Sequence, residues 1–140
     1  MKKIFFFIFV IFFIFSCKRY EDDPYFSLIP KKILIKKKWN MEFVENLKTG
    51  KRSYFPYTKW KIEFKDGDKY NSEEPFLQLN DSLSDWIILK RNGRWVFVGE
   101  TKLQLSYKKD ETNIYIRYEI SRLTRKELWI KNDDTKFFYK

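Results

Sequence analysis

The sequence predicts an all-β fold: an antiparallel up-and-down barrel or half-barrel of about eight strands after a cleaved signal peptide. Apolar and polar residues alternate in several runs, turn-forming pairs separate the runs, and no long amphipathic helical pattern follows residue 16. Successive side chains of a strand point to opposite faces, so this period indicates half-buried strands. Short strands at regular spacing are typical of a barrel, whose closure removes exposed strand edges.

The first 16 residues have the composition of a secretion signal. Lys2 and Lys3 are basic, and residues 4–15 contain no polar side chain. A membrane-spanning helix needs about 20 apolar residues, so this run is too short to be a permanent anchor. We therefore expect residues 1–16 to be removed.

The only cysteine of the chain directly follows the signal. Ile14, Ser16 and Cys17 resemble the lipobox of signal peptidase II substrates, with an aliphatic residue three places before the cysteine and a small residue directly before it. The resemblance implies diacylglycerol on the Cys17 sulfur and fatty acyl chains such as palmitate. Each buried methylene contributes about 0.8 kcal/mol, so two or three chains anchor a protein stably. The alternative is a buried structural cysteine in an uncleaved segment.

Residues 17–30 are predicted to be a lipidated tether. Glu21, Asp22 and Asp23 resemble the surface-export signal of lipoproteins in Bacteroidetes-type bacteria, and a plain solvated tether is the alternative. We expect attachment in the cell envelope, at the outer membrane, with the periplasmic or surface face undecided. Residues 31–140 then form the barrel domain, and residues 31–38 begin it either as a short helix or as an approach to the first strand.

Within this domain, turn signals divide the alternating runs. Thr49-Gly50, Asp66-Gly67 and Asn92-Gly93 suit tight turns because Asn, Asp and Gly tolerate positive φ. Asn92-Gly93 is predicted to join strands at residues 85–91 and 94–100 as a hairpin. The last two strands are predicted at residues 127–131 and 136–140.

One face of these strands supplies the predicted interior. The inward candidates, which would also line any ligand site, are Trp39, Met41, Phe43, Trp60, Ile62, Phe64, Trp95, Phe97, Leu103, Leu105, Ile114, Ile116 and Tyr118. An eight-stranded barrel is just wide enough to be filled by side chains or to hold one small ligand. Alternation does not separate a solid core from a pocket.

Three stretches carry a family resemblance. They are Asp23-Pro24-Tyr25-Phe26-Ser27-Leu28 with Lys31-Lys32 and Lys38-Trp39, then Asn92-Gly93-Arg94-Trp95-Val96-Phe97, then residues 118–128. Their order is similar to that in the lipocalin-like domain of many Bacteroidetes-type lipoproteins. This resemblance implies an eight-stranded meander barrel or half-barrel that can hold an apolar ligand, and it implies no known activity.

Composition narrows the chemistry. The chain has no histidine and one cysteine, which rules out Ser-His-Asp and Cys-His arrangements, zinc sites with His or Cys clusters, and an internal disulfide. Carboxylate pairs such as Asp133/Asp134 fall in apparent turns open to solvent. We expect no catalysis, metal or cofactor.

The charge balance bears on partners. Lys and Arg outnumber Asp and Glu by 29 to 19. This excess favours anionic neighbours or simply a soluble surface. An exported protein rarely meets nucleic acid, so we expect none as a partner; oligomeric state is left undecided. Two functions stay open: a lipid-anchored module that binds a small apolar or amphipathic ligand, and an anchored structural or interaction protein with a filled core that acts through its surface.

Overall fold

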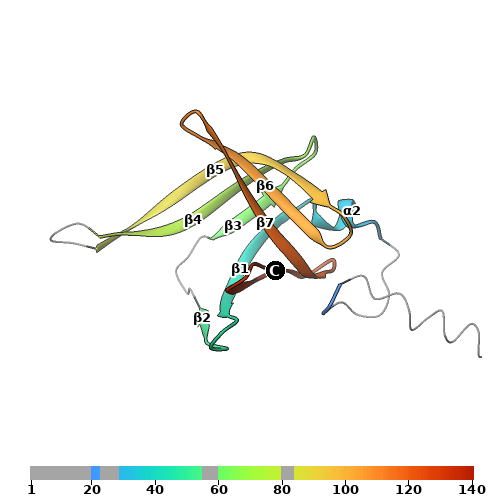
Figure 1. The fold of residues 1–140 in the computed structure, drawn as a ribbon, viewed down its shortest axis with the longest axis horizontal. Coiled ribbons are helices and arrows are strands. Elements are labelled where there is room, and N and C mark those ends of the chain that lie inside the picture. Colours follow the sequence, from blue (N-terminus) through green and yellow to red (C-terminus); the bar gives the residue numbers. More distant parts are fainter. Residues whose placement is uncertain (1–19, 23–28, 55–59, 80–83) are drawn as a thin grey trace, which may run out of the picture.

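The computed structural model describes residues 20–22, 29–54, 60–79 and 84–140, with backbone alone at residues 75–79 and 84–87 (Figure 1). The predicted signal peptide and the lipobox at Ile14, Ser16 and Cys17 lie outside the described residues. The described part contains one short helix, α2 (Lys31–Ile35). Its strands are β1 (Lys38–Asn46), β2 (Arg52–Tyr54), β3 (Lys61–Phe64), β4 (Lys69–Leu79), β5 (Ser84–Val98), β6 (Lys102–Lys109), β7 (Thr112–Leu123), β8 (Leu128–Lys131) and β9 (Thr135–Tyr139).

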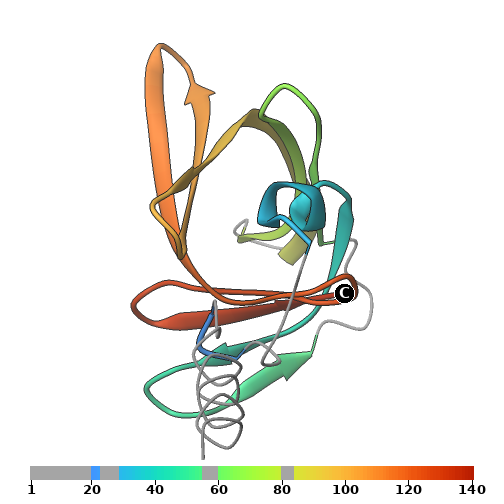
Figure 2. The ribbon, with the colours of Figure 1, turned by 90° about the vertical axis from the view of Figure 1, so that its right-hand side faces the viewer.

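The strands form a closed barrel. They follow one another in the antiparallel order β1-β3-β4-β5-β6-β7-β8-β9, and β9 pairs back with β1 to close a ring of eight strands. The short β2 adds to the second half of β1, on the edge that β3 leaves free. In Figure 2 the strands are seen as a ring, with α2 lying across its opening. The predicted all-β, up-and-down barrel is confirmed.

Helix α2 closes one end of the barrel, which settles the choice left open for residues 31–38. The helix residues Leu34 and Ile35 are buried against the barrel interior. Lys31, Lys36 and Lys37 each bind a turn at this end: Lys31 donates to the Gly99 carbonyl over 3.0 Å, Lys36 pairs with Asp66 over 2.6 Å, and Lys37 donates to the Arg125 carbonyl. Three separate turns therefore hold the helix in place. We call this the closed end.

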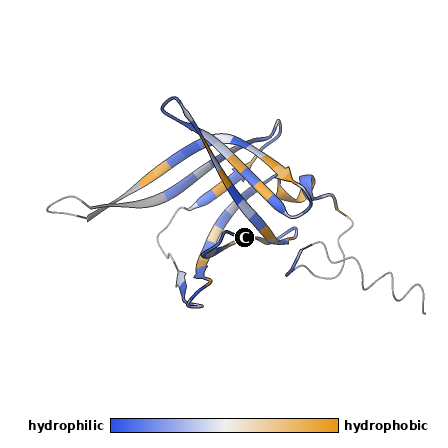
Figure 3. Ribbon diagram, in the orientation of Figure 1, coloured by the Kyte–Doolittle hydropathy of each residue, from blue (hydrophilic) through white to orange (hydrophobic). Residues whose placement is uncertain are grey.

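The hydrophobic core fills the closed end. Trp39 is fully buried, and its indole N–H donates to the Ile35 carbonyl over 2.9 Å, so its one polar group is satisfied. Phe64 packs edge-on against Trp95 with ring centroids 5.7 Å apart. Hydrophobic and hydrophilic positions alternate along the strands (Figure 3), as expected for walls with one face inside.

Two of the predicted turns are confirmed, and one predicted hairpin is wrong. Gly50 and Gly67 lie in the β1–β2 and β3–β4 turns with φ of 67° and 69°. Asn92-Gly93 is not a turn, because β5 continues through it from Ser84 to Val98. The chain turns instead after Val98, where Gly99 has φ 67°.

Gly93 serves close packing inside strand β5. A Cβ atom on Gly93 would lie 2.0 Å from the Ser106 carbonyl oxygen and 2.8 Å from the Tyr70 ring. Glycine in a strand commonly marks a sharp bend or a close approach of another group. Here it lets Tyr70 and β6 approach β5 more closely than any side chain would permit.

Candidate ligand-binding site

The predicted lining residues separate by depth along the barrel. Those of the closed end are buried: Trp39, Met41, Ile62, Phe64, Trp95, Leu103 and Leu105. Phe97 is half-buried beside the core, with the Lys31 ammonium 4.8 Å from its ring centroid. Those farther from α2 are also only half-buried: Trp60, Ile114, Ile116 and Tyr118. Their partial exposure at inward positions shows that solvent reaches the interior from the end opposite α2, which we call the open end.

Phe43 departs from the expected inward orientation. The β1–β9 register shifts between Met41 and Phe43, and this bulge places Val44 against the core in place of Phe43. The Phe43 ring instead stacks on Phe138 with centroids 4.1 Å apart, and the Arg52 guanidinium lies 5.0 Å from its centroid. An alternating sequence carries no mark of a bulge, so this change of face could not be predicted from the pattern.

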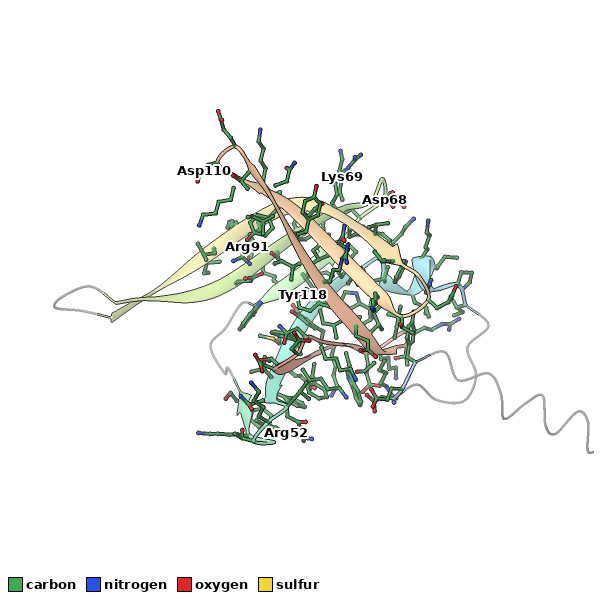
Figure 4. The ribbon with its side chains drawn as sticks, in the orientation of Figure 1. Arg52, Asp68, Lys69, Arg91, Asp110 and Tyr118 are labelled. Atoms are coloured by element: carbon green, nitrogen blue, oxygen red, sulfur yellow. The ribbon has the colours of Figure 1, made fainter. Side chains whose placement is uncertain are left out.

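Polar side chains gather inside the open end. Arg91 of β5 forms an ion pair with Glu74 of β4, and Ser72 donates to Glu74 over 3.3 Å. The side chains of Arg91 and Tyr118 are labelled in Figure 4. The Arg91 guanidinium lies 5.0 Å from the Tyr107 ring centroid, within the range of cation–π attraction. A charged pair inside a barrel loses hydration and must be compensated by such partners. This polar group stands next to the half-buried Tyr118.

The buried tyrosine hydroxyls of this region stay neutral at ordinary pH. Burial, with a smaller contribution from the Glu74 charge, raises the pKa of Tyr118 to about 12. Burial likewise raises the pKa of Tyr139 and of Tyr70 above the usual value. Of these three residues only Tyr118 is partly exposed, and it lies beside the ion pair with apolar rings behind it: Phe137 lies 5.8 Å from Tyr118 and 6.3 Å from Trp60 between ring centroids.

The barrel wall forks next to this group. Pairing between β5 and β6 stops at Gly93 and Tyr107, whereas β4–β5 pairing and β6–β7 pairing both continue beyond it. The two hairpins consequently separate, as Figure 1 shows. A hollow of about 440 Å³ lies in the fork; its lining residues are Leu89, Lys90, Arg91, Asn92, Tyr107, Lys108 and Lys109.

A short N-terminal segment is fixed on the outer wall of the barrel. The Asp22 N–H donates to the Ser121 carbonyl over 2.7 Å, and Arg122 donates to the Asp22 carbonyl over 2.6 Å. Lys136 and Lys131 pair with Asp22 and Glu21, each over 2.6 Å. Burial opposes ionisation of Asp22, but the hydrogen bond and charge of Lys136 outweigh it and hold the pKa of Asp22 below its usual value.

Neither a metal centre nor a spanning helix is found in the described parts of the chain. No group of three or more Cys, Asp or Glu side chains among them could hold a metal ion. Within the same residues, no helix is both long and apolar enough to cross a membrane.

Solved structures with a similar arrangement come from Bacteroides. A lipocalin-like protein from Bacteroides uniformis ATCC 8492 has a TM-score of 0.55 and 11% identity, covering 76% of this chain and 96% of that one. The fold is lipocalin-like. An uncharacterized protein from Bacteroides eggerthii DSM 20697 has a TM-score of 0.56 and 11% identity, covering 75% of this chain and 97% of that one. Identity this low supports the fold alone.

The sequence itself has no match among curated proteins or protein-family profiles. The lipocalin-like interpretation is therefore confirmed as a fold, through structure. The polar residues Glu74, Arg91 and Tyr107 are absent from the predicted site. One signal could have revealed Arg91: it lies four residues before Trp95, on the same face of a strand that runs through Gly93.

Proposed function

We propose that the protein is an outer-membrane lipoprotein whose lipocalin-like barrel binds a small amphipathic molecule at its open end, without catalysis. The observation that carries this proposal is the contrast within one interior. The closed end is packed with apolar side chains, whereas inward residues of the open end are half-exposed around Arg91 and Glu74. Barrel mouths with apolar walls and a few polar groups are a common setting for small-ligand sites.

The distribution of side chains supports an amphipathic ligand over a purely apolar one. Trp60, Ile116 and Phe137 offer apolar surface, and Arg91 with Tyr107 offers hydrogen-bond donors on the β5–β6 side. A ligand with both kinds of surface would satisfy the two sides together. An uncharged hydrocarbon would displace water from the polar side without replacing the hydrogen bonds that the water made.

Ligand binding is tested with the mature chain, residues 17–140, carrying Cys17→Ala so that no lipid is attached. We expect a twelve-carbon amphiphile, added below its micelle concentration, to change tryptophan fluorescence with a saturating, one-to-one curve. Ile116→Trp, which fills the open end, should weaken that binding, whereas Val96→Trp on the outer wall should not. Absence of binding by the unmodified barrel would support the alternative of a protein that acts through its surface.

The anchor is tested separately. Cys17→Ala should abolish incorporation of a fatty-acid analogue into the full-length protein expressed in a bacterium that processes lipoproteins. It should also release the protein from the membrane fraction. Ser16→Ala, which keeps a small residue before the cysteine, is the matched control and should retain label. Continued labelling of the Cys17→Ala protein would contradict lipid attachment at this residue.

A further inference from the structure

The fork between β5 and β6 carries an unusual set of charges. Its hollow is lined by four cationic side chains and no carboxylate, the cations being Lys90, Arg91, Lys108 and Lys109. A second hollow of about 360 Å³ shares Asn92, Tyr107 and Lys108 with it and adds Arg94, again without a carboxylate in its lining. The two hollows together form a region of one sign of charge.

Several of these cations lack a counterion among the described residues. No described carboxylate lies within ion-pair distance of Lys108, Lys109 or Arg94, whereas Lys61, Lys131 and other wall lysines are paired. Lys90 reaches Glu73 only at 3.9 Å, and Arg91 is held by Glu74. Asp110 and Glu111 follow Lys109 in the β6–β7 turn but do not line either hollow. The fork therefore has positive charge to offer a ligand.

The fork is continuous with the interior of the open end. Leu89 and Arg91 lie on the inward row of β5 that continues to Trp95, and Tyr107 lies on the inward row of β6. A molecule seated in the fork would thus touch Leu89 and Tyr107 with its inner part. Its outer part would lie between Lys109, next along the row of Tyr107 toward the β6–β7 turn, and Lys108 on the opposite face of β6. Because β5 and β6 no longer pair here, no ladder hydrogen bond between them has to break for entry.

We propose that the fork binds the anionic headgroup of the ligand, a carboxylate, sulfate or phosphate, while the apolar part extends inward past Leu89 toward Ile116. Lys108 and Lys109 supply the charge, and the Asn92 amide and Tyr107 hydroxyl supply neutral hydrogen-bond donors. This inference rests on the proposed function and adds the sign and the position of the headgroup. It places the head in the side wall, at the separation of two hairpins.

The test compares three probes with the same twelve-carbon chain: dodecanoate, dodecanol and dodecyltrimethylammonium. Calorimetric titration of the mature Cys17→Ala chain should give an affinity for dodecanoate at least about tenfold above that for the other two, since a hydrogen bond to a charged group contributes enough for this factor. Equal affinity for all three would overturn the headgroup assignment and leave the proposed function standing. Failure of all three to bind would count against both.

Substitutions of the fork lysines test whether the preference for dodecanoate depends on them. Lys108→Gln with Lys109→Gln should remove most of the preference for dodecanoate and leave dodecanol binding unchanged, and the arginine pair at the same positions should restore it. Lys102→Gln, exposed on the same strand near the closed end, is the matched control. All three substitutions lie at exposed positions, so we expect the melting temperature to stay within a few degrees. An unchanged preference in the glutamine pair would overturn the proposal.

Two further probes distinguish the source of the anion. Inorganic phosphate should not displace dodecanoate at equal concentration, because it lacks the apolar part. Vesicles of phosphatidylglycerol should not bind the barrel in a way that depends on Lys108 and Lys109. Displacement by phosphate, or vesicle binding lost in the glutamine pair, would assign these lysines to a free ion or to a membrane surface and would overturn the seated amphiphile.

Discussion

The two ends of the barrel are built by the same strands but are packed differently. On β7, Ile120 is 1% exposed at the closed end, while Ile116, two inward positions earlier on the same strand, is only half-buried. Helix α2 covers only the closed end, and the strands of the open end separate at the fork. Side-chain alternation therefore decides which residues face inward. Helix α2 and the fork decide which of these inward residues are shielded from solvent.

The largest expected effect tests this difference directly with one residue type on one strand. Ile120→Ala should cost about 2–5 kcal/mol of unfolding free energy, because it leaves a cavity in a packed core. Ile116→Ala should cost clearly less, since its surroundings are already open to solvent. Urea denaturation followed by circular dichroism measures both. Equal losses would show that the open end is packed as tightly as the closed end.

A second, smaller effect concerns the bend that lets the hairpins separate. Gly93→Ala should cost about 1–3 kcal/mol or more, because the new methyl group would overlap the Ser106 carbonyl and the Tyr70 ring. Gly50→Ala is the control: nothing lies within 4 Å of its added carbon, so only the strain of its positive φ remains. Urea denaturation followed by circular dichroism compares the unfolding free energies of the two variants. If Gly93→Ala were the milder change, close approach would not be the reason for this glycine.

The smallest effect is a pH dependence of the open end. An unfolded tyrosine ionises near pH 10, but burial raises the pKa of Tyr118 to about 12. The raised pKa stabilises the folded state below pH 10, and this contribution is lost as the pH rises from 10 through the folded-state pKa of about 12. Tyr118→Phe should therefore lose less stability between these pH values than the unmodified chain.

The matched control for this measurement is on the same strand. Tyr115→Phe removes the hydroxyl of a residue that is 62% exposed on the outer wall. Urea midpoints of both variants are compared at neutral pH and across the alkaline interval. A Tyr118→Phe protein that follows the Tyr115→Phe protein throughout would mean that Tyr118 is as well hydrated as an outer residue.

The sequence predicted the fold through its apolar interior, and it failed where the interior is polar. Ile62 and Phe64 alternate with charged residues, and both are buried as expected. On β4 the inward positions after Tyr70 are Ser72 and Glu74, so no apolar alternation marks this strand and it was not predicted. The missed strand β4 and the missed site residue Glu74 share that one cause.

The expected number of strands was right for a partly wrong reason. The predicted hairpin at Asn92-Gly93 splits β5 into two strands, and this extra strand offsets the absence of β4 from the prediction. Asn-Gly pairs are strong turn signals, and local sequence cannot show that a ring from another strand covers the glycine. The bulge that turns Phe43 outward is equally invisible, because it depends on the register of β9.

The fixed N-terminal segment has a consequence for a membrane-attached protein. Tyr20 is 3% exposed, and only two residues separate it from Cys17. Three residue steps span at most about 10 Å, so with acyl chains on Cys17 the barrel would be mounted directly on the bilayer. It could neither swing freely nor reach far into the surrounding space. The height of the fork above the lipid would then be set by the dimensions of the barrel itself, and ligand exchange would be confined to a thin layer next to the membrane.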